Sequence, residues 1–227
     1  MATLVDVVGK CEYPGRGLAI GRDSDGLPFA AYWLTGRSPA SQQRELVVSA
    51  QEIVVQELGG GGADELRHYT AAIRDEDWFI VGNGTHVSEL AGTHADCVDL
   101  QVALRNIDYE PDPPIRTPRI FAGAVVEGPE LLDVVVGSAR SYSADQVQHP
   151  SLFLRRSEEA TAGVVTTYSG TSAQVTTDGY PSVVSVEVEW ESLPDLLWSR
   201  LDPALRVGLV VIPLITETFE GSILRSR

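Results

Sequence analysis

Lysine is almost absent from this sequence, and cysteine and long apolar runs are scarce. The 17 basic residues are all arginine except Lys10, and 32 acidic residues give a net charge of 17 − 32 = −15 over 227 residues. A chain this acidic, without a lysine-rich stretch, cannot attract a polyphosphate backbone or an anionic membrane surface by bulk charge. We therefore expect no binding to nucleic acid or membrane, and any anionic partner must be held by a few placed arginines.

The scarcity of cysteine and of long apolar runs narrows the class of protein further. Cys11 and Cys97 are too few and too isolated for a disulfide framework or a zinc knuckle. The histidines are scattered, so a metal site, which would need His86 and His94 to meet in space, is disfavoured. The run from 207 to 215 is far shorter than the roughly 20 residues that span a bilayer, and the first residues lack the basic region of a secretory signal. These absences predict a soluble protein of the reducing cytoplasm.

Two common nucleotide-binding motifs are also missing. The chain has no Gly-x-x-x-x-Gly-Lys-Ser/Thr loop and no Gly-x-Gly-x-x-Gly, which excludes a P-loop nucleotidase and a dinucleotide fold at the level of motifs. The glycine run 59–62 does not follow a strand and open a helix. We interpret it as a loop, with a domain linker as the alternative.

The apolar pattern is mainly that of strands. Expected strands cover 16–21, 28–35, 45–55 (as one or two strands), 78–81, 119–126, 131–137, 163–168, 183–189 and 206–215. Expected helices cover 63–74 with Asp64 as N-cap, 96–106 and 191–201. Strands that outnumber helices predict an α+β layered fold, with residues 1–227 as a single domain. An extended sheet edge leaves a homo-oligomer open.

Four polar segments lie at predicted strand ends, where a rigid scaffold usually presents functional groups. They are 12–16, 35–41, 82–86, and 108–110 together with 117–119. Each could simply cap, turn and pair at the surface. Four in one chain favour a polar pocket that holds an anion through bidentate arginines.

The order of these segments resembles a known family. The segment Tyr13-Pro-Gly-Arg16 is followed by Gly21, and residues 31–38 read Ala-Tyr-Trp-Leu-Thr-Gly-Arg-Ser. Residues 81–86 read Val-Gly-Asn-Gly-Thr-His, residues 108–110 read Asp-Tyr-Glu, and residues 117–119 read Thr-Pro-Arg. Together these motifs resemble the archaeal-type inosine monophosphate (IMP) cyclohydrolases. The resemblance covers about half the chain well.

This resemblance implies a fold and a reaction. The fold is a four-layer αββα sandwich like that of the N-terminal-nucleophile hydrolases. The reaction is the dehydrative ring closure of 5-formamidoimidazole-4-carboxamide ribonucleotide (FAICAR) to IMP, a step of purine biosynthesis on a small-molecule nucleotide precursor. The substrate's carboxamide nitrogen attacks its own formyl carbon, so no protein nucleophile, metal or redox cofactor is required. The enzyme must instead hold a near-attack geometry, stabilise an oxyanion and assist proton transfer.

The resemblance also suggests roles for nine residues. Phosphate and oxyanion contacts are expected from Arg16, Arg37 and Arg119. Glu110 is the candidate for proton transfer, with Tyr69 or Tyr109 as its partner. The base or formyl group is expected to be oriented by Asn83 and His86. Asp108 either binds substrate or pairs with an arginine, and Tyr69, in the expected helix, has packing as its alternative role.

Two other classes stay open. The residues after Arg37 and after His86 depart from the family pattern, which bears on the identity of the substrate. An N-terminal-nucleophile amidohydrolase would need a nucleophile at a newly freed N-terminus, and Cys11, with ten residues ahead of it, is a poor candidate. A non-catalytic purine-nucleotide-binding paralogue would keep the arginines without turnover.

Overall fold

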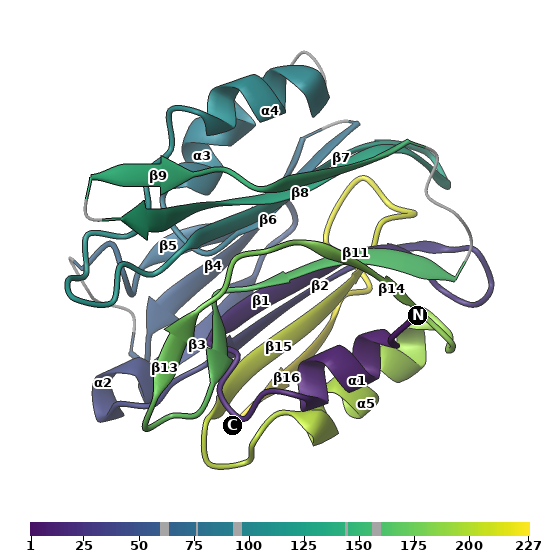
Figure 1. The fold of residues 1–227 in the computed structure, drawn as a ribbon. Coiled ribbons are helices and arrows are strands. Elements are labelled where there is room, and N and C mark those ends of the chain that lie inside the picture. Colours follow the sequence, from purple (N-terminus) through teal and green to yellow (C-terminus); the bar gives the residue numbers. More distant parts are fainter. Residues whose placement is uncertain (60–63, 76, 93–96, 144, 156–159) are drawn as a thin grey trace.

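Two antiparallel sheets packed face to face form the centre of the computed structural model (Figure 1). It describes residues 1–59, 64–75, 77–92, 97–143, 145–155 and 160–227. The six-stranded sheet has the order β14-β11-β1-β2-β15-β16. Its strands are β1 (Arg16–Arg22), β2 (Pro28–Thr35), β11 (Thr161–Thr166), β14 (Ser182–Ser185), β15 (Arg206–Pro213) and β16 (Ile223–Ser226).

The second sheet has eight strands, seven of them in the order β10-β8-β7-β6-β5-β4-β3, with β9 paired to β8. Its strands are β3 (Arg44–Val48), β4 (Glu52–Glu57), β5 (Tyr69–Asp75), β6 (Trp78–Gly82), β7 (Arg119–Glu127), β8 (Glu130–Ser143), β9 (Gln146–Gln148) and β10 (Ser151–Arg155). A separate two-stranded ribbon pairs β12 (Tyr168–Gly170) with β13 (Val175–Thr177). That residues 1–227 form one domain stays a prediction, although the six-stranded sheet takes strands from both ends of the chain.

Helices cover both outer faces of this pair of sheets. On the eight-stranded sheet lie α3 (His86–Ala91) and α4 (Cys97–Leu104), and on the six-stranded sheet lie α1 (Leu4–Gly9) and α5 (Leu193–Arg200), which the 3₁₀ turn η1 (Trp190–Ser192) precedes. The short α2 (Pro39–Gln42) joins β2 to β3. The predicted α+β fold with four αββα layers is therefore confirmed. No helix among the described residues is long and apolar enough to cross a membrane.

Strand periodicity explains the layers. In β2 every residue is buried, because its two faces contact different cores. Tyr32 and Leu34 pack between the sheets, whereas Phe29 and Trp33 pack under α1 and α5. Successive side chains of a strand point to opposite faces, so one apolar run serves both cores.

One predicted helix is wrong and several elements were not predicted. Residues 69–74 of the expected helix 63–74 belong to β5, which pairs with β4 and β6, and Asp64 instead accepts a hydrogen bond from the Leu66 amide in a turn. Pairing between two strands outweighs the local helical preference of this short segment. Gly60–Gly62 lie outside the described residues. The helix α3, which was not predicted, begins at His86, the last residue of the expected loop 82–86. The strand β16, which follows β15 in the chain, was not predicted either.

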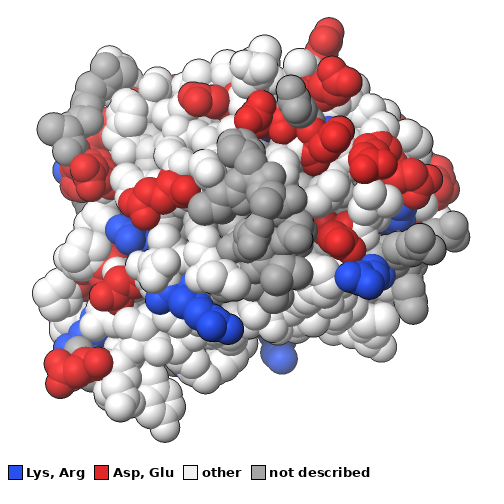
Figure 2. Space-filling model, turned by 90° about the horizontal axis from the view of Figure 1, so that it is seen from above, with Lys and Arg blue, Asp and Glu red and all other residues white. Residues whose placement is uncertain are grey.

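The antiparallel topology gathers the predicted polar segments at one end of the sandwich. β1 begins at Arg16 opposite Leu34, near the end of β2, and β6 ends at Gly82 opposite Phe121, near the start of β7. The predicted loops at strand ends are therefore neighbours in space. On the face that carries α4, by contrast, acidic side chains outnumber basic ones (Figure 2), in keeping with the net charge.

Candidate functional site

A polar cleft of about 290 Å³ lies where these strand ends meet. The segment from the end of β2 to the start of β3 contributes positive charge and hydroxyl groups to its lining, from Thr35, Arg37, Ser38, Ser41 and Arg44. Tyr13, Arg16, Glu110, Asp112, Thr117 and Tyr168 also line the cleft.

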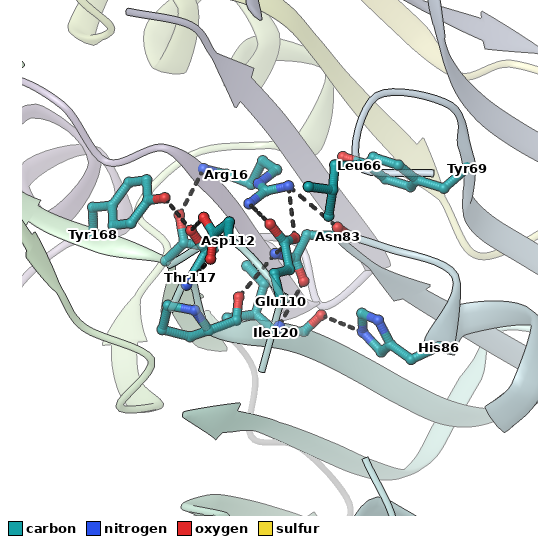
Figure 3. Close-up of polar contacts among 12 residues, drawn as sticks. Arg16, Leu66, Tyr69, Asn83, His86, Glu110, Asp112, Thr117, Ile120 and Tyr168 are labelled. Atoms are coloured by element: carbon teal, nitrogen blue, oxygen red, sulfur yellow. Dashed lines mark hydrogen bonds and ion pairs between the residues drawn. The ribbon is translucent and has the colours of Figure 1, made fainter. Parts of the chain in front are cut away.

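Arg16 and Glu110 form a buried, bidentate ion pair in this cleft (Figure 3). The Arg16 Nη1 atom lies 2.8 Å from Glu110 Oε1, and Nη2 donates to Oε2 at 2.9 Å. Both side chains are less than a tenth exposed. Such a fork is geometrically specific, and it fixes the carboxylate relative to β1.

Burial sets the protonation behaviour of this pair. It raises the pKa of Glu110, and the Arg16 guanidinium opposes that rise. Burial also opposes the charge on Arg16, yet the Glu110 carboxylate holds the Arg16 pKa well above its usual range. Glu110 is therefore a carboxyl group with more affinity for protons than an exposed one, a property that suits proton transfer.

Asn83 is a second hydrogen-bond partner of Glu110. Its Nδ2 donates to the Pro118 carbonyl at 2.9 Å and to Glu110 Oε1 at 3.3 Å, and its Oδ1 accepts from the Ile120 amide at 2.7 Å (Figure 3). Asn83 is completely buried. These bonds occupy both ends of the amide, so the side chain positions Glu110 and the entry to β7.

His86 lies further from the cleft and is also fully buried. Its Nε2 is 3.1 Å from the Ile120 carbonyl oxygen, which only accepts, so Nε2 carries the proton. Burial lowers the His86 pKa to about 3. The positive charge of Arg119, which lies beside Gly84, lowers the His86 pKa further. Arg119 is not among the residues that line the cleft.

Because His86 is neutral when folded and charged in acid when unfolded, acid should destabilise the protein through it. The ordinary histidine pKa is about 6.5, so stability is present above that pH and is lost as the pH falls towards the folded value. Between about pH 6.5 and pH 5 this loss is about 2 kcal/mol. We expect His86→Gln to show a correspondingly smaller loss of unfolding free energy in urea titrations. His149→Gln, a partly exposed histidine that also contacts a backbone carbonyl, is the matched control. Equal pH dependence in wild type and His86→Gln would contradict this assignment.

Arg44, at the start of β3, is a cation of the cleft that sequence reasoning missed. Its Nε donates to the Ser41 carbonyl at 2.9 Å and its Nη2 to the Thr35 carbonyl at 3.3 Å. Burial lowers its pKa, and among the described residues no carboxylate pairs with it. Arg37 is exposed beside it and donates to the Ser172 carbonyl at 3.5 Å. The spacing of seven residues between the two arginines, across a turn, was the available signal.

A further arginine of the cleft, Arg67, is neutralised by carboxylate partners. Arg67 lines the cleft but pairs with Glu57 and Asp64, each at 2.8 Å. Arg37 and Arg44 are therefore the cleft cations without a carboxylate partner among the described residues.

The predicted tyrosines and Asp108 lie outside the cleft lining. Tyr69 is buried on β5, and its hydroxyl is 2.9 Å from that of Tyr32, whose pKa burial raises well above the usual range. Asp108 is exposed, and its carboxylate accepts from the Tyr109 amide at 2.7 Å, with no arginine paired to it among the residues that the structure describes. Among the nine predicted residues, the cleft lining includes Arg16, Arg37 and Glu110.

Three further residues of the cleft were not predicted as functional. Asp112, Thr117 and Tyr168 are joined by hydrogen bonds through the Thr117 hydroxyl. Thr117 stood in a quoted motif, and Asp112 follows another. No sequence signal connects them with Tyr168, which lies 51 residues beyond Thr117.

Comparisons with known proteins identify the family of this chain. Residues 13–212 match the family described as IMP cyclohydrolase-like protein. Over 113 residues the chain is 32% identical to the IMP cyclohydrolase of Methanocaldococcus jannaschii, which is 48% of this chain and 55% of that protein, so the match spans about half of the relative. An N-acylethanolamine-hydrolyzing acid amidase ortholog from Caenorhabditis elegans superposes with a TM-score of 0.46 and 8% identity over 92% of this chain and 99% of its own. Since the family match covers most of the sequence, the chain belongs to the IMP cyclohydrolase-like family.

Proposed function

We propose that this protein is an IMP cyclohydrolase, which closes the second purine ring of FAICAR to give IMP and water. The observation that carries the proposal is the buried Arg16–Glu110 pair in a cleft that also holds unpaired arginines, within a chain of this family. Its partner is then a small purine nucleotide precursor, and its compartment is the cytoplasm.

Glu110 is the group proposed to move protons. In the reaction the carboxamide nitrogen forms a bond to the formyl carbon and loses one proton. The formamide nitrogen loses its own proton as it forms a C=N bond to the same carbon, whose C–O bond breaks, and the former formyl oxygen leaves with both protons as water. A carboxylate whose pKa is raised by burial is a better base than an exposed one. Arg16 and Asn83 hold it in one orientation, which supports its use at a fixed point of the substrate.

The 5′-phosphate is proposed to bind against Arg37 and Arg44. Arg16 is engaged with Glu110, and Arg119 lies beside Gly84, so these two arginines are poor candidates for the phosphate. Arg44 is already desolvated and fixed by backbone carbonyls, which lowers the cost of ordering it around an anion. Ser38 and Ser41 also line the cleft.

Holding the phosphate at these arginines and the reacting groups at Glu110 accounts for most of the expected catalysis. Both reacting groups belong to one molecule, so the enzyme must select the conformer in which nitrogen and carbon are in contact. Well-oriented intramolecular reactions gain about 7–11 kcal/mol from such placement.

Turnover is the direct test of this function. Purified protein is supplied with FAICAR, and IMP formation is followed by ultraviolet absorbance against a protein-free reaction. A rate no higher than the uncatalysed background would overturn the proposal, and binding of IMP without turnover would favour the nucleotide-binding paralogue.

Substitution of the two unpaired arginines should weaken substrate binding. Loss of a hydrogen bond to a charged group costs about 1.5–3 kcal/mol, so Arg37→Ala and Arg44→Gln should each raise KM by roughly tenfold or more, with a smaller effect on kcat. Arg225→Ala is the matched control, because it removes a partly exposed arginine that pairs with Asp195 outside the cleft. An unchanged KM in both variants would reject the phosphate contact.

The amidohydrolase alternative gains no support from the cleft. Its described lining residues include no cysteine, and burial raises the pKa of the Cys11 thiol, which disfavours the reactive thiolate. Intact-mass measurement would settle the matter, because a mass that corresponds to a chain starting at Met1 or Ala2 removes an autoprocessed nucleophile.

A further inference from the structure

Asp112, Thr117 and Tyr168 form a hydrogen-bond chain that ends at the cleft (Figure 3). The Thr117 amide donates to Asp112 Oδ1 at 2.7 Å, and the Thr117 hydroxyl donates to Asp112 Oδ2. The same Thr117 hydroxyl is hydrogen-bonded to the Tyr168 hydroxyl. Thr117 is fully buried, so bulk water does not compete for these hydrogen bonds.

The direction of this chain follows from counting protons. A hydroxyl carries one proton and can accept further hydrogen bonds, whereas a carboxylate only accepts. The Thr117 proton is used on Asp112, so the Tyr168 hydroxyl must be the donor to Thr117. The Tyr168 oxygen therefore presents lone pairs, and no proton, to the cleft that it lines.

The Tyr168 ring is held in place by its surroundings. It stacks on Tyr13 with ring centroids 5.5 Å apart, and its amide donates to the Pro14 carbonyl at 3.2 Å. Gly15, with φ of 70°, lies so close that a Cβ atom there would come within 2.4 Å of the ring. Burial also raises the pKa of Tyr168, so the phenol keeps its proton near neutral pH.

We propose that Tyr168 is a specificity-determining residue that accepts a hydrogen bond from an N–H group of the purine base or its precursor, with Asp112 and Thr117 as positioning residues that direct its proton away from the ligand. This inference rests on the proposed function. The attacking carboxamide nitrogen loses one hydrogen on ring closure and keeps the other, which becomes N1–H of IMP. A fixed acceptor can hold that N–H and orient the nitrogen, and it disfavours a ring nitrogen that itself offers a lone pair.

The binding of two nucleotides tests whether Tyr168 prefers an N–H donor to a ring nitrogen that offers a lone pair. IMP presents N1–H as a donor, whereas purine riboside 5′-monophosphate presents a bare N1 acceptor with the same ribose and phosphate. Calorimetric titration should show that wild type prefers IMP. Tyr168→Phe should reduce this preference by about 3–10-fold, because one hydrogen bond contributes about 0.5–1.5 kcal/mol. Melting temperature and circular dichroism confirm that each variant is folded.

The two positioning residues make a sharper test, because they change the direction of the chain. Thr117→Ser keeps the hydroxyl and should keep the preference. Thr117→Val removes it, which frees the Tyr168 proton to point into the cleft and should reduce the preference for IMP. Asp112→Asn places an N–H₂ opposite the Thr117 hydroxyl, which reverses the chain and turns Tyr168 into a donor, so the preference should shift towards the purine nucleotide.

The outcomes separate this inference from the function on which it rests. An IMP preference that Tyr168→Phe leaves unchanged, or that Thr117→Ser loses as fully as Thr117→Val, overturns the role of Tyr168 even if FAICAR is turned over. A preference that follows the predicted pattern supports it, even if turnover is absent and the cyclohydrolase proposal fails. A folded wild type that binds neither nucleotide, or both equally, also overturns it.

Discussion

Glu110→Gln is expected to lower kcat by about 10²–10⁴-fold, the range that general acid–base catalysis contributes. Glutamine keeps the shape of the side chain and one acceptor for Arg16 but cannot take up a proton. FAICAR turnover under saturating substrate measures the effect. Glu130→Gln is the matched control, because Glu130 is exposed and pairs with Arg22 outside the cleft. Undiminished turnover by Glu110→Gln would reject the proton-transfer role.

The pH profile gives an independent reading of the same residue. If the ionised form is the base, kcat falls as the pH drops through the Glu110 pKa, which burial raises above the ordinary carboxyl range. The acid limb of wild type should therefore lie above that range and should be missing from the residual activity of Glu110→Gln. If the acid limb of the kcat profile lay at the same pH in wild type and in Glu110→Gln, the titrating group would be a residue other than Glu110.

Arg16→Met should destabilise the protein by about 3–5 kcal/mol, because it leaves the Glu110 carboxylate buried without its partner. Methionine fills much of the space of the arginine stem, so the lost charge dominates over lost packing. The free energy of unfolding from urea titration measures this. A loss below about 1 kcal/mol, typical of exposed pairs, would show that the pair is not desolvated.

The destabilisation by Arg16→Met should depend on pH with a defined sign. Without Arg16 the pKa of Glu110 rises further, so the folded variant binds a proton more tightly than the unfolded chain. Such a group stabilises the fold below its unfolded pKa, and this contribution is lost as pH rises through the folded value. The gap between wild type and variant should be larger at about pH 8 than at about pH 5. The double variant Arg16→Met with Glu110→Gln should recover part of the lost unfolding free energy. Its difference from wild type should depend less on pH.

Much of the fold followed from local pattern. The strands around Arg16 to Gly21 and Pro28 to Thr35 were predicted to within a residue or two, because a run of strand-forming residues is a local property. The four-layer architecture came from the resemblance rather than from periodicity. The segment with Tyr69 was misassigned, because its strand state depends on hydrogen bonds to β4 and β6 that are remote from the local pattern.

The candidate site divides in the same way. The motifs identified Arg16, Arg37 and Glu110, since strand-end polar residues are recognisable one segment at a time. They did not identify Arg44 as a cleft cation or Tyr168 as the end of a hydrogen-bond chain. Both depend on which groups are desolvated and on which partners they meet.

The sequence by itself determined the acidic charge, the strand-rich layered class and the motif order that places this chain in its family, because each is a property of composition or of short segments. Only the tertiary structure decided that Arg16 is committed to Glu110, that His86 is a neutral buried residue, and that Thr117 joins Asp112 to Tyr168. Those facts arise from contacts between residues far apart in the chain, where burial removes water and makes each charge and proton depend on one specific partner.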